Sequence, residues 1–401
     1  MKMLWGGGNP RFLFYLCGLM RRFLRNILLC LLPLLLWGCP SERGGVEWGE
    51  VCYAPHSARG YEIVATEGSS TVLRILSPWP GADDRVVREL FISREGECPP
   101  EGFEGTVVDG IPERVVVMSS SHVAFIDALG LAESIVGVSG GDYITNHLVR
   151  EGLSAGRVRE VGYDANVNYE VLASLRPDLV FIYGTSGENG TMSMKLDELS
   201  IPYVYISDHT ETSPLGKSEW VVAFGEIFDC RKGAEEYFAN VAERYESLRL
   251  RALDFEGRPK VMLNSPYKDV WFVPADDSYV VRLIEDAGGE YICKGGGGTR
   301  LSRPISGENA YIYLAGADFW LHPNDARTMG ELVAANPKFA SVEVVRRGGV
   351  YNCTAISTPA GGSDFWESGA LRADLVLADL VAILHPEEVE EQQLHYYEQL
   401  R

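Results

Sequence analysis

The sequence has too few basic residues to balance its acids. Lys and Arg together number 36, Asp and Glu number 56, and the formal net charge is −20. The first 38 residues contain no acid, so the whole excess of negative charge belongs to the rest of the chain. A body this acidic is repelled by phosphate backbones, which argues against nucleic-acid binding.

Several short motifs that mark metal or nucleotide sites are also lacking. None of the eight cysteines forms a CxxC pair, and no His-Glu-x-x-His sequence is present. The glycine-rich stretch Gly295–Thr299 is not followed by the Lys-Ser/Thr of a phosphate loop. These absences argue against a zinc module, a zinc protease and a nucleotide-binding loop.

The N-terminus has the pattern of an export signal. A basic cluster at residues 21–25 precedes the apolar run Ile27–Trp37, which is too short to span a bilayer. The run ends at Gly38 and Cys39, and Leu36–Cys39 resembles a lipobox, in which the cysteine receives a lipid. We therefore expect a signal peptide over 1–38, lipidation of Cys39, and a location in the periplasm or cell envelope; an uncleaved apolar anchor is the alternative.

The remaining cysteines allow two interpretations. Cys52 and Cys98 flank the same small segment and could pair in an oxidising compartment. Buried free thiols are the simpler prediction for Cys230, Cys293 and Cys353.

Residues 39–50 are small and polar and are predicted to be a tether, and residues 51–110 a β-rich extension. The alternating stretches Tyr61–Thr66 and Thr71–Leu76 surround a turn at 67–70, which predicts a hairpin.

From residue 111 onward, short apolar runs alternate with helical stretches, which indicates parallel sheets covered by helices. No proline interrupts the helical periodicity between Ser218 and Phe255. The predicted fold class is therefore α/β, with two Rossmann-like lobes joined by a single long helix. The boundaries that we expect are an N-terminal lobe at 111–215, a bridging helix at 216–256, a C-terminal lobe at 257–391 and a tail at 392–401.

Five motifs in this order carry a resemblance to a known family. They are RVVVMSSSHVAFIDALG at Arg114–Gly130, VGY with NYEVLASLRPDLV at Val161–Val180, LIEDAGGEY at Leu283–Tyr291, SGE at Ser306–Glu308, and LHPE at Leu384–Glu387. Together they resemble the periplasmic substrate-binding lipoproteins of ABC importers for iron–siderophores, haem and cobalamin. The resemblance implies a monomeric, non-enzymatic protein without a cofactor or resident metal. It would capture an iron or cobalt chelate between two lobes and deliver it to an ABC permease in the inner membrane.

The resemblance also implies roles for two glutamates. Glu170 and Glu308 match the family's permease-docking positions, one in each lobe. A pair of carboxylates at fixed separation would orient the protein on permease arginines. The alternative is that each is a first-turn acid favoured by the dipole of its own helix, and both roles can hold at once.

The resemblance also implies twelve ligand-binding residues, taken from their positions in the family's motifs. They are Ser120, Ser121, His122, Tyr143, Tyr163 and Tyr183 in the first lobe, and Tyr267, Trp271, Arg303, Ser363, Asp364 and Trp366 in the second. Aromatic rings and an arginine suit a flat chelate with an acidic group. Core packing is the alternative for each aromatic, and for Trp271 and Tyr183 the two interpretations are evenly balanced.

Three other functions are weighed against this one. A zinc- or manganese-binding transport protein would use the dispersed histidines His122, His147, His209 and His322. An exported tetrapyrrole chelatase-like enzyme would use His122 as a general base with Asp364 as its partner. A surface receptor that kept only the binding fold would have no need of Glu170 and Glu308.

Overall fold

The structure, a computed structural model, describes residues 48–80, 82, 87–163, 166–184, 190–267, 270–295, 302–390 and 393–401. The predicted signal peptide, Cys39 and most of the tether lie outside these ranges. Every helix and strand named below belongs to one compact unit. In the ranges described, no helix combines the length and the apolar character needed to cross a membrane.

The N-terminal extension is one five-stranded sheet with strand order β1-β2-β3-β4-β5. Its strands are β1 (Val51–Tyr53), β2 (Tyr61–Ala65), β3 (Thr71–Leu76), β4 (Val87–Ser93) and β5 (Thr106–Asp109). The predicted hairpin is β2–β3, antiparallel, with Val64 opposite Val72.

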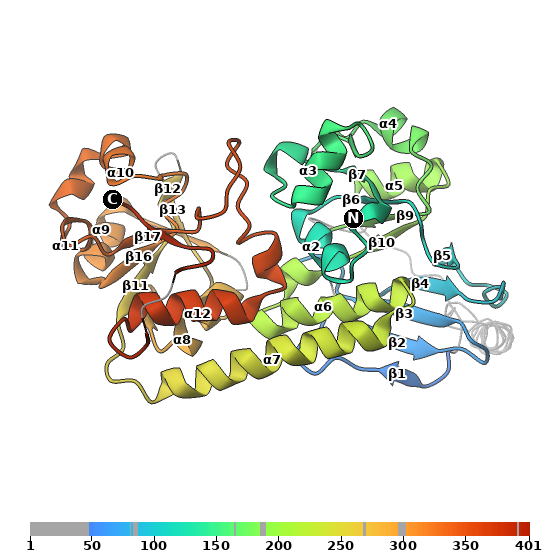
Figure 1. The fold of residues 1–401 in the computed structure, drawn as a ribbon, viewed down its shortest axis with the longest axis horizontal. Helices are drawn as coiled ribbons and strands as arrows, with labels where there is room; N and C mark the ends of the chain where they lie inside the picture. The colour runs from blue at the N-terminus through green and yellow to red at the C-terminus, as the bar shows by residue number, and fades with distance from the viewer. Residues whose placement is uncertain are drawn as a thin grey trace, which may run out of the picture. The chain divides into compact units, whose positions relative to one another are not determined.

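The N-terminal lobe is a parallel sheet of order β10-β9-β6-β7-β8 covered by helices (Figure 1). Its central strand consists of three valines that are all buried, as expected of a parallel strand covered on both faces. The strands are β6 (Val115–Val117), β7 (Ile135–Val138), β8 (Arg159–Glu160), β9 (Leu179–Ile182) and β10 (Tyr203–Tyr205). The helices are α2 (Ser120–Ala128), α3 (His147–Ser154), α4 (Tyr169–Ser174) and α5 (Thr191–Glu198).

The C-terminal lobe has a main sheet of order β14-β11-β16-β17-β18 and a small sheet of order β12-β13-β15. The main sheet contains β11 (Lys260–Leu263), β14 (Glu290–Tyr291), β16 (Phe319–Leu321), β17 (Val350–Asn352) and β18 (Glu398–Gln399). The small sheet contains β12 (Pro266–Tyr267), β13 (Val270–Val273) and β15 (Arg303–Ile305). The helices are α8 (Tyr279–Asp286), α9 (Gly307–Gly316), α10 (Met329–Ala335), α11 (Glu343–Arg346) and α12 (Ala373–Leu384).

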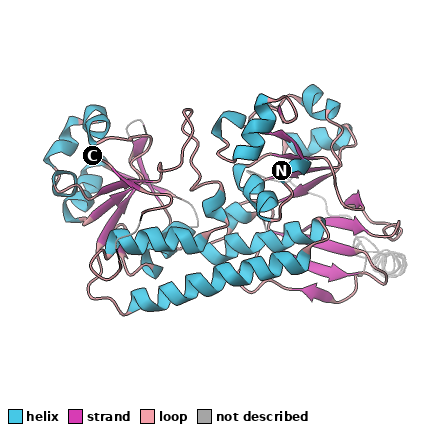
Figure 2. Ribbon diagram, in the orientation of Figure 1, coloured by secondary structure: helices cyan, strands magenta, loops and turns pink. Residues whose placement is uncertain are grey.

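The predicted helix over 216–256 is wrong in its extent, because the structure contains two helices, α6 (Pro214–Ile227) and α7 (Arg231–Leu253) (Figure 2). The break is a Schellman turn: Asp229 has a φ of 58°, the Cys230 N–H donates to the Gly225 carbonyl, and the Asp229 N–H donates to the Glu226 carbonyl. α7 packs against α6 and against α12 of the C-terminal lobe, so it is the single long helix that joins the lobes. Its 23 residues span about 35 Å.

The predicted tail is also corrected, since residues 393–401 complete the C-terminal lobe. β18 pairs antiparallel with β17, and Tyr396 and Tyr397 are buried. The carboxylate of Asp379 accepts hydrogen bonds from the backbone N–H groups of His395, Tyr396 and Tyr397. This carboxylate therefore fixes the end of the chain against α12.

Candidate functional site

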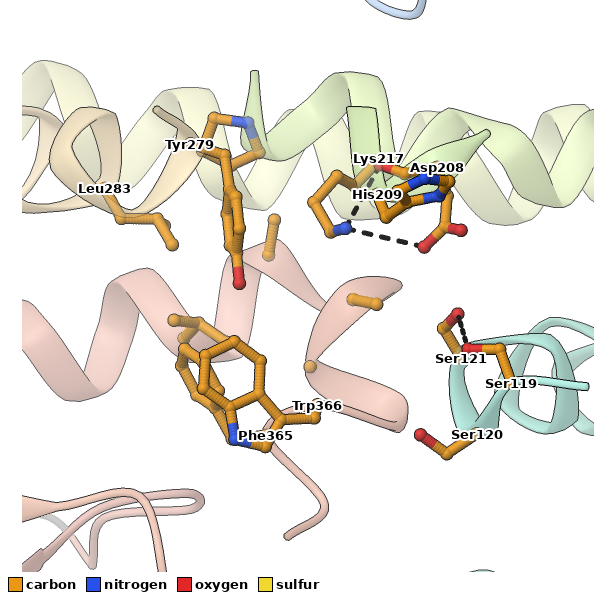
Figure 3. A pocket seen from close by; sticks show the side chains of 15 residues that line it. Ser119, Ser120, Ser121, Asp208, His209, Lys217, Tyr279, Leu283, Phe365 and Trp366 are labelled. Atoms are coloured by element: carbon orange, nitrogen blue, oxygen red, sulfur yellow. Dashed lines mark hydrogen bonds and ion pairs between the residues drawn. The ribbon is translucent and has the colours of Figure 1, made fainter. Parts of the chain in front are cut away.

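A cavity of about 310 Å³ lies between the two lobes (Figure 3). Its N-terminal side is polar and is lined by Ser119, Ser120, Ser121, Asp208, His209 and Lys217. Its C-terminal side is mostly apolar and includes Tyr279, Leu283, Phe365 and Trp366. The two sides therefore offer different chemistry to one ligand.

The three serines belong to the start of α2. Ser119 is the N-cap residue, with extended backbone at φ −139°, and its hydroxyl oxygen lies 3.0 Å from that of Ser121. The first N–H groups of a helix have no partner within the helix and carry the positive end of its dipole. This side of the cavity consequently favours an anionic group.

A buried ion pair supplies the charge of the cavity. The ammonium of Lys217 donates to the Asp208 carbonyl at 3.1 Å and to its Oδ2 at 3.4 Å, and it lies 4.8 Å from the ring centre of Tyr279. Burial raises the pKa of Asp208, but Lys217, the two nearby histidines and a hydrogen bond from Ser121 together outweigh it and hold the pKa below its usual value. Burial lowers the pKa of His209, so the imidazole is neutral at pH 7.

The opposite wall is aromatic. Phe365 and Trp366 meet edge to face with ring centres 4.7 Å apart, and Trp366 remains 50% exposed. Tyr279 is half-buried in the wall, and desolvation raises its pKa. Aromatic faces beside a cavity can stack against a flat organic ligand.

Of the predicted ligand residues, Ser120, Ser121 and Trp366 line this cavity. His122 does not line it, and its placement in the site was wrong. Its ring is completely buried in the N-terminal lobe beside Phe181 and Phe224, where burial lowers its pKa to about 4. Successive helical residues point about 100° apart, which turns His122 inward.

In the C-terminal lobe, three further predicted residues serve the fold. Trp271 is a core residue that donates to the Leu263 carbonyl and packs against Trp320. Arg303 donates to the carbonyl of Cys293. Ser363 donates to the carbonyl of Cys353, so none of the three lines the cavity.

Asp364 accepts one hydrogen bond across the lobes, from the hydroxyl of Thr145, and one within its own lobe, from the hydroxyl of Ser368. Tyr183 packs edge-on against His209, with ring centres 6.0 Å apart. The side chain of Tyr267 lies outside the described residues.

Tyr143 and Tyr163 form an exposed pair in the N-terminal lobe, with ring centres 6.3 Å apart. Neither contributes to the lining of the cavity.

Sequence reasoning missed Asp208, Lys217, Tyr279 and Phe365, and it named His209 only as a ligand of the rival metal site. The sequence did contain a signal for the lysine, because Lys217 interrupts a stretch of mostly apolar residues with helical periodicity. In the structure this stretch is α6, which is buried along its whole length. A cation in such a helix needs a buried partner or a ligand.

The two predicted docking glutamates are exposed, one in each lobe. Glu170 lies in the first turn of α4, which Asn168 caps, and Glu308 in the first turn of α9, which Ser306 caps. Their contact with a permease stays a prediction.

The structure does not gather the residues of the rival functions. In the described part of the chain, no group of three or more His, Cys, Asp or Glu could hold a metal ion. His122 and Asp364 belong to different lobes, and the carboxylate beside His122 is Asp208, 4.0 Å away. Cys52 and Cys98, which could have paired, are both free and exposed.

Comparison with known proteins gives the family. The sequence pattern of the periplasmic binding protein family matches residues 115–356, which is more than half of the chain. The chain therefore belongs to this family, whose members are substrate-binding components of ABC transporters and not enzymes. Such a component implies a permease partner and a location in the cell envelope.

Individual relatives agree with this assignment. An uncharacterised lipoprotein of Methanocaldococcus jannaschii is 29% identical over 71% of this chain and 68% of its own. An uncharacterised ABC transporter substrate-binding lipoprotein of Bacillus subtilis is 27% identical over 44% of this chain and 51% of its own. A periplasmic haem-binding protein of Pseudomonas aeruginosa has a similar fold, with a TM-score of 0.56 and 18% identity over 73% of this chain and 99% of its own.

Proposed function

We propose that this protein captures an iron- or cobalt-containing chelate (a haem, a cobalamin or a ferric siderophore) in the cavity between its lobes and delivers it to an ABC permease. The observation that supports this most is the two-sided cavity, with serines and Lys217 facing aromatic rings. Haem-binding neighbours of the same fold add support.

Each side of the cavity has a part in this proposal. Trp366 and Phe365 would stack against the flat part of the chelate, and Lys217 with the first turn of α2 would face a carboxylate or phosphate at its edge. The cavity is at the small end of the range for organic ligands, so a macrocycle would extend past it along the exposed ring of Trp366.

The proposal includes the anchor and the assembly state. Cys39 would carry a lipid that holds the monomer at the membrane, and the polar stretch after it would leave the lobes free to reach the permease.

Titration of residues 41–401 against haem, cobalamin, ferric siderophores and Zn²⁺ tests the proposal. We expect tight one-to-one binding of one chelate, weakened at least tenfold by Trp366→Ala. Phe272→Ala is the matched control, because Phe272 is 43% exposed in the same lobe and does not line the cavity. Binding of Zn²⁺ alone, or of no compound in the panel, would overturn the proposal.

A further inference from the structure

One segment of the C-terminal lobe reaches the N-terminal lobe directly. Residues 357–368, here called the strap, lie between β17 and α12 and are drawn in red between the lobes in Figure 1. Ser357 and Ser363 form an isolated antiparallel bridge at its base. The strap carries Trp366, the exposed aromatic residue of the cavity wall.

Two carboxylates of the strap hold the N-terminal lobe. Glu367 accepts hydrogen bonds from the backbone N–H groups of Thr145 and Asn146, each 2.8 Å long, one at each carboxylate oxygen. Asp364 accepts a hydrogen bond of 2.9 Å from the hydroxyl of Thr145. Glu367 is only 2% exposed, so this contact is a buried junction between the lobes.

The backbone of the strap also lies against the backbone of the N-terminal lobe, at Gly362 and Tyr143. A Cβ atom at Gly362 would collide with the backbone carbonyl of Tyr143. A side chain at position 362 would therefore push the strap away from the N-terminal lobe, because backbone atoms cannot yield as a flexible side chain can.

The strap is also fixed on its own side. The hydroxyl of Ser368 donates to Asp364 at 2.6 Å and lies 2.9 Å from the hydroxyl of Tyr396. Trp366 thus stands between two residues, Asp364 and Glu367, that are both bound across the lobes. Loss of the hydrogen bonds between Glu367 and the N-terminal lobe would therefore also displace the backbone that carries Trp366.

We propose that Glu367 is a positioning residue: it ties the strap to the N-terminal lobe, holds Trp366 over the cavity, and makes retention of the ligand sensitive to pH. The effect on ligand retention rests on the proposed function. The junction itself does not, because its hydrogen bonds form without a ligand.

The charge balance around Glu367 gives the direction of the pH effect. Burial raises the pKa of Glu367 to about 7; the N–H of Thr145 opposes the shift and the negative charge of Asp364 adds to it. On the facing loop, Asp142 and His147 flank the two N–H donors and are exposed, and on the C-terminal side Tyr396 contacts Ser368.

A strap that opened would return Glu367 to water, where its pKa is near 4.3. The closed strap binds the proton more tightly than the open one, so closure is favoured at low pH. The ratio of closed to open strap therefore falls as pH rises from about 4.3 to 7, by up to about tenfold for each pH unit. Once protonated, the carboxyl still accepts one N–H through its carbonyl oxygen.

The strap can be tested without ligand by hydrogen exchange at the amides of Thr145 and Asn146, corrected for the intrinsic rate at each pH. In the wild-type protein we expect protection to fall at least tenfold between pH 5.5 and 8. Glu367→Gln should abolish this dependence, and Glu343→Gln, at an exposed glutamate of the same lobe, should retain it. A Glu367→Gln profile equal to the wild type would overturn the inference.

A second variant covers the case in which Glu367→Gln folds poorly. Gly362→Ala should remove protection of the same amides at every pH, through the clash with Tyr143. With a chelate bound, its dissociation rate should rise with pH in the wild type and be high and flat in Gly362→Ala. Protection that is unchanged in Gly362→Ala would also overturn the inference. If no chelate binds, the proposed function fails, whereas the exchange profile still decides the role of the strap.

Discussion

The carboxylate of Glu219, inside helix α6, accepts a hydrogen bond of 2.9 Å from the hydroxyl of Tyr53 on β1. The same carboxylate accepts the backbone N–H groups of His56, Ser57 and Ala58, and Glu219 is completely buried. One side chain therefore satisfies four donors from the N-terminal extension. The extension is consequently docked on the N-terminal lobe through this carboxylate.

We predict that Glu219→Gln lowers the free energy of unfolding by about 2 to 4 kcal/mol, because the amide nitrogen cannot accept from the N–H groups that now face it. Urea unfolding measures this. Glu235→Gln is the control, since Glu235 forms a half-exposed pair with Arg231 that should contribute less than about 1 kcal/mol. Equal effects of the two substitutions would contradict the docking role of Glu219.

Two buried histidines predict how stability depends on pH. Burial lowers the pKa of His122 and of His322 to about 4, whereas an unfolded histidine titrates near 6.5. Between these values the unfolded chain holds more protons than the native one. Stability from each histidine is therefore fully present above pH 6.5 and is lost as pH falls to 4, by about 3 kcal/mol. Glu367 acts in the opposite direction, because its pKa is raised.

The variant His122→Leu separates these contributions. In the described part of the chain, neither ring nitrogen of His122 has a hydrogen-bond partner, so leucine removes buried polar atoms without breaking a bond. We expect unchanged or higher stability at pH 7 and a shallower loss between pH 6.5 and 4. His147→Gln is the control, as His147 is exposed. An unaltered slope in His122→Leu would show that His122 is not buried in the neutral form.

The sequence predicted those elements of the two lobes whose structure follows from a pattern of neighbouring residues. Strand β9 is a short apolar run after Pro177 and Asp178, and its pattern alone indicates a buried strand. The break between α6 and α7 was not predictable in this way, because the left-handed position is Asp229 rather than glycine. The role of residues 393–401 depends on contacts with Asp379, which no local pattern reveals.

The site was predicted only in part, for a related reason. Ser120, Ser121 and Trp366 belong to motifs whose position in the family is recognisable. Lys217 and Tyr279 reach the same cavity from α6 and α8, and only the packed fold brings these helices together.

Lys217 should determine affinity for anionic chelates. Lys217→Met leaves the buried carboxylate of Asp208 without its cation, which we expect to cost about 3 to 5 kcal/mol of stability. The double variant Lys217→Met with Asp208→Asn should recover most of that stability. It should still bind haem about 10- to 100-fold more weakly than the wild type, because the charged hydrogen-bond donor is gone.

Haem dimethyl ester provides the matching ligand control, since it lacks free carboxylates. Its affinity should be the same for the wild type and the double variant, as measured by absorbance titration. If the double variant binds haem as tightly as the wild type does, Lys217 serves only to pair with Asp208.

The exposed glutamates Glu170 and Glu308 lead to the last prediction, which concerns transport. Replacing both with alanine removes two charges from opposite lobes but leaves the caps Asn168 and Ser306 in place, so each helix should lose only about 0.3 to 1 kcal/mol. Chelate affinity should therefore be unchanged, while uptake by cells that express the matching permease should be lost. The double variant Glu151→Ala with Glu343→Ala, also exposed and in opposite lobes, should transport normally. Wild-type uptake by the first variant would show that these carboxylates merely favour their own helices.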